Sequence, residues 1–167
     1  SVGQILNALR QNQLDTKTLV IFTSDNGPWL SKRPDSGSAG PLRGGKLTTW
    51  EGGVRVPAIA WWPGTVAAGS ASDTVAGTID LLPTAVTLAG GIVPATPVID
   101  GRDMSPLLLG TSTQSPRDAH FYFSGYELQA VRQGGWKLAV TPQPDALGNG
   151  VAPDANVNPR LYNLNND

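Results

Sequence analysis

Residues 18–28 read Thr-Leu-Val-Ile-Phe-Thr-Ser-Asp-Asn-Gly-Pro, and this stretch decides the fold class. The apolar and β-branched run over residues 18–23 predicts a strand that is buried on both faces, as in a parallel sheet covered by helices. The polar residues 24–28 have strong turn chemistry and end the strand. Residues 1–12 carry apolar side chains at helical spacing, which predicts an amphipathic helix before the strand. A helix, a buried strand and a polar loop in this order indicate an α/β domain.

The rest of the sequence divides into two parts near residue 95. An apolar run at 56–62 predicts a second strand, and a helix follows that Asp80 caps and Gly90-Gly91 ends. We therefore expect an α/β part over residues 1–95 and a small antiparallel part over residues 96–167, an α+β addition. The second part contains a hairpin turn at Gly134-Gly135, a Pro-, Asn- and Asp-rich loop at 141–159, and strand-like runs at 120–123, 126–133, 136–140 and 161–164.

The composition excludes several classes of function. With 12 basic and 13 acidic residues and a net charge of −1, the chain has no footprint for nucleic acid. The chain has no cysteine, which excludes disulfides, thiolate metal sites and cysteine nucleophiles within these 167 residues. No apolar run approaches the roughly 18 residues of a membrane span. No signal-peptide pattern opens the chain, which begins within the predicted helix, so we expect a start inside a domain.

Asp25 and Asn26 follow the first predicted strand directly. Open α/β sheets place their ligands at the carboxyl ends of their strands. A carboxylate beside an amide oxygen suits a hard cation such as calcium or magnesium. Asp-Asn-Gly is also common turn material, and from the residues alone the simple turn is the better interpretation.

Lys46 closes the segment Gly40-Pro-Leu-Arg-Gly-Gly-Lys, which nearly spells a phosphate-binding loop. Leu47 stands where that motif needs a hydroxyl for magnesium, and no strand immediately precedes Gly40, so we reject a nucleotide site. What remains is a lysine on a glycine-rich loop that can bring a compact positive charge to an anion. In isolation, an ordinary solvated lysine is again the favoured interpretation.

Three further polar residues are expected to be structural. Glu51 and Arg55 flank Gly52-Gly53, and a buried ion pair that braces this loop is favoured over a catalytic role. His120 is the only histidine and lies in a strand-like run, which favours a partly buried structural side chain.

Taken together, these segments resemble the sulfatase family. The block over residues 46–64, Lys-Leu-Thr-Thr-Trp-Glu-Gly-Gly-Val-Arg-Val-Pro-Ala-Ile-Ala-Trp-Trp-Pro-Gly, is highly specific. The matches occur in family order over nearly the whole chain, at 18–29, 40–64, 79–84, 88–90, 100–110, 130–138 and 161–164.

The resemblance implies a fold, a reaction and a set of site residues. The implied fold is part of an alkaline-phosphatase-like α/β sandwich followed by the small antiparallel subdomain. The implied reaction is the hydrolysis of a sulfuric ester, either a small-molecule sulfate ester or a sulfated sugar, and aryl, steroid and sugar sulfates all stay open. In such enzymes the residues that match Asp25 and Asn26 ligate calcium, and the lysine that matches Lys46 contacts the sulfate group and the leaving-group side. The family habit also implies a periplasmic, secreted or lysosomal compartment.

The sequence departs from the family in what it lacks. Family members carry a formylglycine nucleophile made from a Cys or Ser in a Cys/Ser-x-Pro-x-Arg motif, and Gln114-Ser-Pro-Arg117 has the wrong spacing. The acidic calcium ligands and the catalytic histidine and lysine of the family's earlier half have no counterparts. We therefore expect a fragment that needs the N-terminal half of the enzyme, is inactive alone, and self-associates through the exposed edges of the strand at 18–23.

Two other functions stay open at this point. A phosphonate or phosphodiester hydrolase of the same superfamily would share the metal-bearing strand end. A non-catalytic module that binds a sulfated glycan would explain the missing nucleophile.

Overall fold

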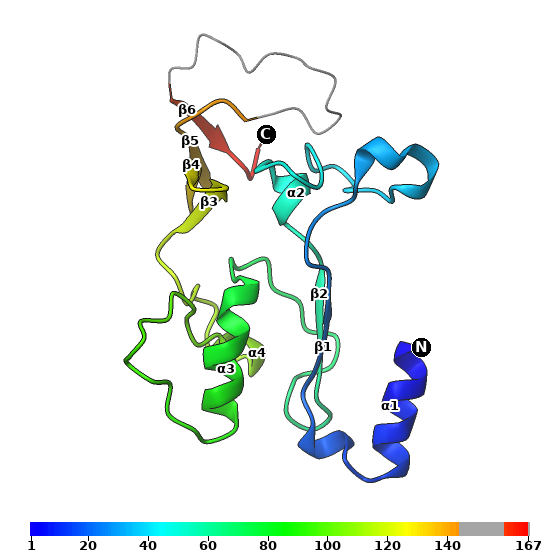
Figure 1. Ribbon diagram of the computed structural model, residues 1–167. Helices are drawn as coiled ribbons and strands as arrows, with labels where there is room; N and C mark the ends of the chain where they lie inside the picture. The colour runs from blue at the N-terminus through cyan, green and yellow to red at the C-terminus, as the bar shows by residue number, and fades with distance from the viewer. Residues whose placement is uncertain (144–158, 167) are drawn as a thin grey trace. The chain divides into compact units, whose positions relative to one another are not determined.

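The computed structural model describes residues 1–143 and 159–166, and these form two compact units (Figure 1). The first unit comprises Ser1–Thr23 and Ala58–Arg117. The second comprises Ser24–Pro57 and the described residues from Asp118 onward. The residues predicted to carry chemistry, Asp25, Asn26 and Lys46, all belong to the second unit.

The first unit contains helices and a two-stranded ribbon. The strands pair antiparallel from Val20 opposite Trp61 to Thr23 opposite Ala58. The indole of Trp62, just past the ribbon, donates a hydrogen bond to the Thr16 carbonyl over 2.8 Å. The elements are α1 (Val2–Gln11), β1 (Val20–Thr23), β2 (Ala58–Trp61), α3 (Leu81–Leu88), α4 (Ser105–Leu108) and two 3-10 helices at Asp15–Lys17 and Thr78–Asp80.

The predicted double burial of the first strand is wrong for this structure. β1 is antiparallel to β2, and each pairs only with the other among the described residues. A two-stranded ribbon has no further strands to cover it, so apolar side chains stay in contact with solvent. Phe22 on β1 is 56% exposed and Ile59 on β2 is 62% exposed. The apolar run correctly predicted a strand, but an apolar run does not specify its neighbours.

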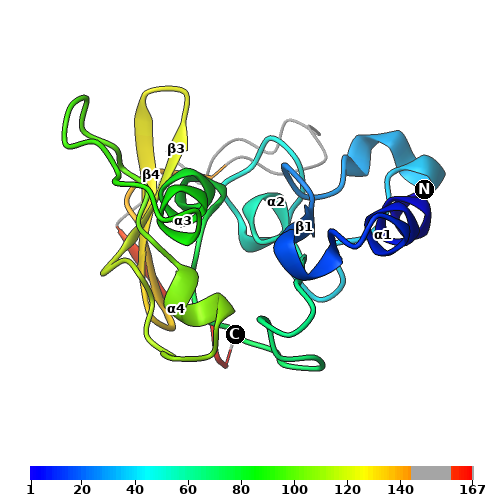
Figure 2. The same ribbon diagram turned by 90° about the horizontal axis from the view of Figure 1, so that it is seen from below.

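Asp80 does not cap α3 as predicted. Its backbone is already helical, with φ −79° and ψ −13°, because the 3-10 helix at Thr78–Asp80 runs directly into α3. The side chain is fully buried and accepts hydrogen bonds from the amides of Gly77 and Arg102, each over 2.7 Å. The guanidinium of Arg117 pairs with the same carboxylate. Asp80 is therefore a buried anchor for three chain segments of the first unit. Figure 2 shows α4 beside α3, with which it is in contact.

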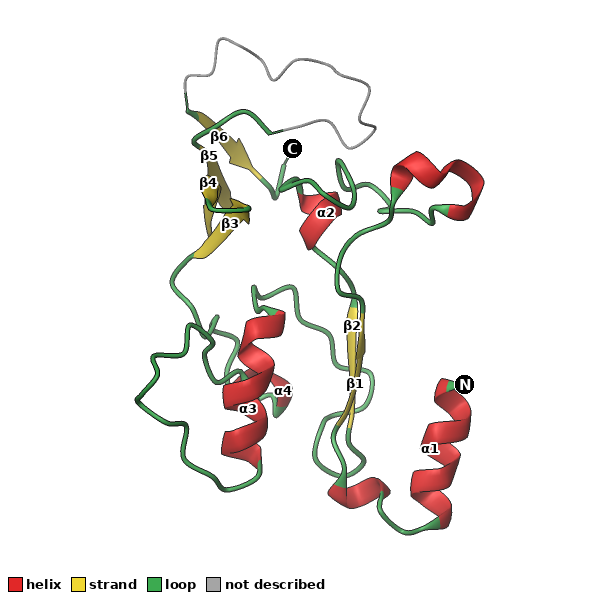
Figure 3. Cartoon of the chain, viewed as in Figure 1, coloured by secondary structure: helices red, strands yellow, loops and turns green. Residues whose placement is uncertain are grey.

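The second unit is built on an antiparallel sheet. The strands follow the order β3-β4-β5-β6, and Gly134 has a φ of +55° in the tight turn between β4 and β5. Tyr122, Ala130 and Ala139 form the buried core, with Tyr162 packed against it. Loops dominate the other part of this unit (Figure 3). The elements are α2 (Glu51–Val54), β3 (His120–Ser124), β4 (Glu127–Gln133), β5 (Trp136–Ala139), β6 (Arg160–Asn163) and a kinked 3-10 segment at Leu30–Asp35.

The predicted fold class is confirmed: helices combine with antiparallel strands, and the C-terminal strands form a small sheet of their own. The division at residue 95 stays a prediction. Most of the predicted loop at 141–159 lies outside the described residues. Within the part of the chain that the structure describes, no helix has the length and apolar character needed to cross a membrane.

Candidate functional site

Asp25 and Asn26 lie in the turn that follows β1. Asp25 is exposed and Asn26 is half-buried. The Asn26 Nδ2 group donates to the Gly27 carbonyl over 3.0 Å, and the Ser24 hydroxyl donates to the Asn26 carbonyl over 2.8 Å. The side-chain nitrogen of Asn26 is therefore hydrogen-bonded to the backbone. Its Oδ1 atom points away from that contact. The turn presents a carboxylate and an amide oxygen at neighbouring positions.

Two backbone hydrogen bonds join this turn to the segment over residues 46–53, one to the loop that carries Lys46 and one to α2. The Lys46 amide donates to the Pro28 carbonyl over 2.8 Å, and the Gly27 amide donates to the Gly53 carbonyl over 2.9 Å. We call this paired backbone the loop seam. The seam brings the predicted metal ligands and the predicted anion-contacting lysine into one small region of the second unit.

Glycines make this close approach feasible. A Cβ atom on Gly27 would collide with the carbonyl oxygen of Gly52, and a Cβ on Gly45 would collide with the Pro28 carbonyl oxygen. Since both obstacles are backbone atoms, no side-chain rotation could relieve them. The sequence pattern Asp-Asn-Gly, which suggested only a turn, therefore also meets a packing requirement of the seam.

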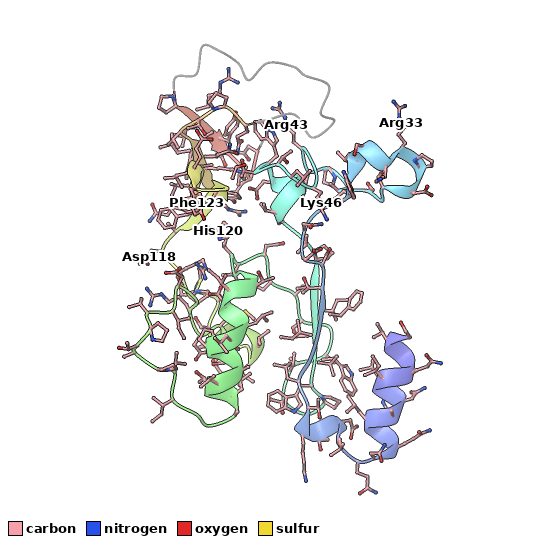
Figure 4. The ribbon with its side chains drawn as sticks, in the orientation of Figure 1. Arg33, Arg43, Lys46, Asp118, His120 and Phe123 are labelled. Carbon is pink, nitrogen blue, oxygen red and sulfur yellow. The ribbon has the colours of Figure 1, made fainter. Side chains whose placement is uncertain are left out.

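The Lys46 side chain is half-buried and lies in cationic and aromatic surroundings. Its Nζ atom is 5.4 Å from the centre of the Trp29 ring, and the Nζ atom of Lys32 is 4.5 Å from the same ring. Figure 4 shows Arg33 pointing away from α2 at the far side of the 3-10 segment. Leu47, next to Lys46, has a φ of +73°, an unusual conformation for a bulky residue. Two ammonium groups therefore lie near the same indole ring.

The sequence interpretation singled out Glu51 but missed the partners that surround its carboxylate. Glu51 is 7% exposed. Oε1 accepts from the Tyr122 hydroxyl over 2.8 Å and from Lys137 Nζ over 3.0 Å, while Oε2 accepts from Arg132 over 2.8 Å. The sequence predicted that Glu51 and Arg55 form a buried ion pair that braces the loop between them. Glu51 does form a buried ion pair, but its partners are Arg132 and Lys137, which come from β4 and β5.

Burial and charge together set the protonation of this cluster. Burial alone would raise the pKa of Glu51, but the charge and hydrogen bond of Lys137, with help from Tyr122 and Arg132, bring its pKa below the usual value. Burial lowers the pKa of Lys137, and the Glu51 charge opposes that shift. Burial and the Glu51 carboxylate both raise the pKa of Tyr122. Glu51 is therefore ionised in the folded protein.

Lys137 also holds the end of the Lys46 loop. Its Nζ atom donates to the Thr49 carbonyl, and its exposed fraction is only 1%. The Thr49 hydroxyl donates to Gln129 Oε1 over 2.7 Å and accepts from Gln143 Nε2 over 2.6 Å. Because side chains alternate along a strand, a lysine between Trp136 and Leu138 would be expected on the solvent face, so the sequence pattern gave no sign of this buried cation. Its partner could not be read from the sequence.

His120 has the structural surroundings that were expected of it. Its ring is half-buried and packs edge-on against Tyr122, with the ring centres 4.8 Å apart.

Among the described residues, no three His, Cys, Asp or Glu side chains gather closely enough to hold a metal ion.

Asp25 and Asn26 nevertheless fit one part of a calcium site. Both offer the hard oxygen atoms that calcium prefers. A bidentate carboxylate and an amide oxygen supply about three ligands, whereas calcium takes about six to eight. The chemistry of the pair therefore fits a shared site that other oxygen donors complete.

Comparison with known proteins identifies the class. The Sulfatase family model matches residues 1–92, and the chain belongs to this family. Arylsulfatase A of Homo sapiens is 41% identical over 181 aligned residues, which cover 100% of this chain and 35% of that protein. N-acetylgalactosamine-6-sulfatase of Canis lupus familiaris is 46% identical over 139 residues, covering 82% of this chain and 26% of that protein.

Solved structures agree on the fold. The PsFucS1 sulfatase from Pseudoalteromonas sp. superimposes with a TM-score of 0.84 and 34% identity, over 98% of this chain and 34% of that one. The neighbours are sulfatases of the alkaline-phosphatase-like fold, so the predicted fold family is confirmed. The chain spans 26% to 35% of the length of these relatives.

Proposed function

We propose that this chain supplies part of the active site of a sulfuric ester hydrolase. Asp25 and Asn26 would contribute two calcium ligands, and Lys46 would contact the sulfate group. The observation that carries the proposal is the loop seam, in which Lys46 and Gly27 are each hydrogen-bonded across to the facing segment. Family membership supports the reaction class.

The chemistry suits the residues. Hydrolysis of a sulfate ester concentrates negative charge on the non-bridging and leaving oxygens in the transition state. Fixed positive groups in a water-poor site lower the cost of that charge. Bound calcium would supply Lewis-acid stabilisation of the sulfate oxygens. Lys46 would place its ammonium against the same oxygens or the leaving group, with Trp29 limiting its contact with water.

The nucleophile would come from polypeptide outside these residues. The 167 residues contain no cysteine and no Ser-x-Pro-x-Arg sequence from which formylglycine could be made. We propose that the chain alone does not hydrolyse sulfate esters and that the remaining calcium ligands, catalytic histidine and catalytic lysine join it from the rest of the enzyme. The substrate would be a small sulfate ester or a sulfated sugar.

A direct experiment compares the protein encoded by the complete gene, here called the full-length enzyme, with the 167-residue chain. Each is assayed with an aryl sulfate, a sulfated monosaccharide, an aryl phosphonate and a phosphodiester, with and without calcium. We expect calcium-dependent hydrolysis of a sulfate ester by the full-length enzyme only. Faster hydrolysis of the phosphonate or the phosphodiester would assign the alternative reaction, whereas glycan binding without hydrolysis of any ester would assign a binding module.

Two further properties concern the location of the enzyme and the association state of the isolated chain. By analogy with the family, the enzyme would work in the periplasm, outside the cell or in lysosomes, and recovery of the full-length enzyme in the cytosolic fraction would contradict this. The exposure of Phe22 and Ile59 supports self-association of the isolated chain. Analytical ultracentrifugation that finds a monomer at all concentrations would argue against it.

A further inference from the structure

The short helix α2 is the point at which the two site loops meet. The Gly52 amide donates to the Arg43 carbonyl over 2.7 Å, at the start of the Lys46 loop. The Gly53 carbonyl accepts from the Gly27 amide, next to Asn26. A shift of α2 would therefore disturb both segments, which also meet directly at the hydrogen bond from the Lys46 amide to the Pro28 carbonyl.

Glu51 is the first residue of α2 and fastens it to the sheet. All three partners of its carboxylate lie on strands: Tyr122 on β3, Arg132 on β4 and Lys137 on β5. Lys137 adds a hydrogen bond to the Thr49 carbonyl, two residues before Glu51. One buried ammonium thus holds both the helix and the peptide that leads into it.

The strength of this attachment follows from its burial. Lys137 is 1% exposed and Glu51 is 7% exposed, so water cannot replace a lost partner. A buried charge without its partner is strongly disfavoured, and the chain would move to solvate it. The part of the chain with the greatest freedom to move is α2 together with the loops joined to it, because the opposite side of the cluster is a hydrogen-bonded sheet.

We propose that the buried pair of Glu51 and Lys137 is a positioning device that fixes the Lys46 loop against the Asp25-Asn26 turn. Neither residue touches substrate or metal. Both act through the backbone of α2 and the loop seam. The proposal rests on the sulfatase function proposed above, because the loops matter to catalysis only if Lys46 and Asp25 have the roles assigned there.

The first test measures the protection of backbone amides and does not depend on activity. Amide hydrogen exchange is measured in the full-length enzyme for wild type, Glu51→Gln and Asp80→Asn. Asp80 is a matched control, because it is another buried carboxylate paired with arginine but lies in the other unit. We expect exchange at the Gly27 and Lys46 amides to rise at least about tenfold in Glu51→Gln and to stay at the wild-type rate in Asp80→Asn.

The second test reads catalysis. We expect Glu51→Gln to lower kcat about 10- to 100-fold with little change in KM, because the lysine and the metal ligands are displaced relative to each other. Activity is expressed per folded molecule, with folding followed by near-UV circular dichroism. Glu51→Asp, which keeps the charge on a shorter side chain, should recover part of kcat. Should Glu51→Gln fail to fold, Glu51→Asp and Lys137→Arg would carry both measurements.

The outcomes separate the two proposals. Unchanged exchange at Gly27 and Lys46 in a folded Glu51 variant would overturn the positioning role, as would equal losses of kcat in the Glu51 and Asp80 variants. A full-length wild type that hydrolyses no sulfate ester would instead overturn the proposed function, while the exchange measurement would still test whether Glu51 fixes the loops.

Discussion

Glu51 and Asp80 are both buried carboxylates that pair with arginine, yet they hold the chain in different ways. Asp80 accepts two hydrogen bonds from backbone amides, one three residues away at Gly77 and one 22 residues away at Arg102, and two from the Arg117 side chain. Glu51 is held entirely by side chains, from residues 71 to 86 positions away in the sequence. Asp80 stabilises the segments that surround it. Glu51 links loops to a sheet.

The difference shows that burial and charge do not by themselves reveal a role. Either residue would be expensive to replace, because a buried charge is left without compensation. What distinguishes them is the segment that each one fixes. Glu51 begins the helix to which the turn of Asp25 and the loop of Lys46 are hydrogen-bonded. The Asp80 carboxylate instead joins Gly77, Arg102 and Arg117.

Replacing Lys46 should have the largest effect on catalysis. Glu51 is proposed to act only through the loop that it holds, and Lys46 is the residue of that loop proposed to contact the sulfate group. We expect Lys46→Ala in the full-length enzyme to lower kcat about 100- to 1,000-fold, the usual loss for a group that stabilises transition-state charge. Lys32→Ala is the control, because Lys32 lies over the same Trp29 ring. Steady-state kinetics with an aryl sulfate would measure both, and equal losses would remove the special role of Lys46.

The two buried ion pairs, that of Glu51 and that of Asp80, should contribute similarly to the free energy of unfolding. We expect Lys137→Met and Asp80→Asn each to lower the free energy of unfolding by about 3 kcal/mol, because each breaks a buried ion pair. Urea denaturation of the full-length enzyme, followed by circular dichroism, would measure both losses. Similar losses together with unequal kcat values would sharpen the contrast between an anchor and a positioning device. Losses below about 0.5 kcal/mol would place the pairs among weak surface interactions.

Much of the fold could be predicted from the sequence, because its signals are local. The Gly134-Gly135 pair marked the hairpin, and the runs on either side became β4 and β5 within about one residue. The antiparallel pairing of β1 could not be predicted, since an apolar run does not name its partner. The helix α2 has four residues, two of them glycine, and so lacks any periodic pattern.

The candidate site could be predicted only in part. Asp25, Asn26 and Lys46 were chosen from the residues and from a family resemblance, and their roles stay predictions. The Glu51 cluster was beyond reach, because Lys137 follows Glu51 by 86 positions and nothing in one sequence pairs them. The role of Asp80 was misjudged for a related reason: helix-capping rules consider nearby amides, whereas its carboxylate also meets Arg102 and Arg117.

Removing the carboxylate of Asp25 should have a smaller effect than the changes above. We expect Asp25→Ala to weaken calcium binding by the full-length enzyme at least about tenfold, because one charged ligand of several is lost. Asp35→Ala makes the same change of charge at an exposed position of the same unit and should leave binding unchanged. Isothermal titration calorimetry would compare them, and equal affinities in wild type and Asp25→Ala would exclude Asp25 as a ligand.

The smallest effect concerns pH and the third partner of Glu51. Burial and the Glu51 carboxylate raise the pKa of Tyr122 above its ordinary value near 10. A group with a raised folded-state pKa contributes its full stability below the unfolded-state pKa and loses that contribution as pH rises toward the folded-state pKa. Wild type should therefore lose stability above about pH 10, by up to about 1.4 kcal/mol per pH unit from this group.

Tyr122→Phe should remove that part of the alkaline slope. Lys137, whose pKa burial lowers, contributes a slope of the opposite sign, so the informative quantity is the difference between variant and wild type. At pH 7 we expect the variant to lose about 1–2 kcal/mol for the missing hydrogen bond to a charged group. Tyr126→Phe is the control because Tyr126 is fully exposed. Urea denaturation at pH 7 to 11 would measure the slopes, and a Tyr122→Phe slope equal to that of wild type would show that the phenol keeps no special contact with Glu51.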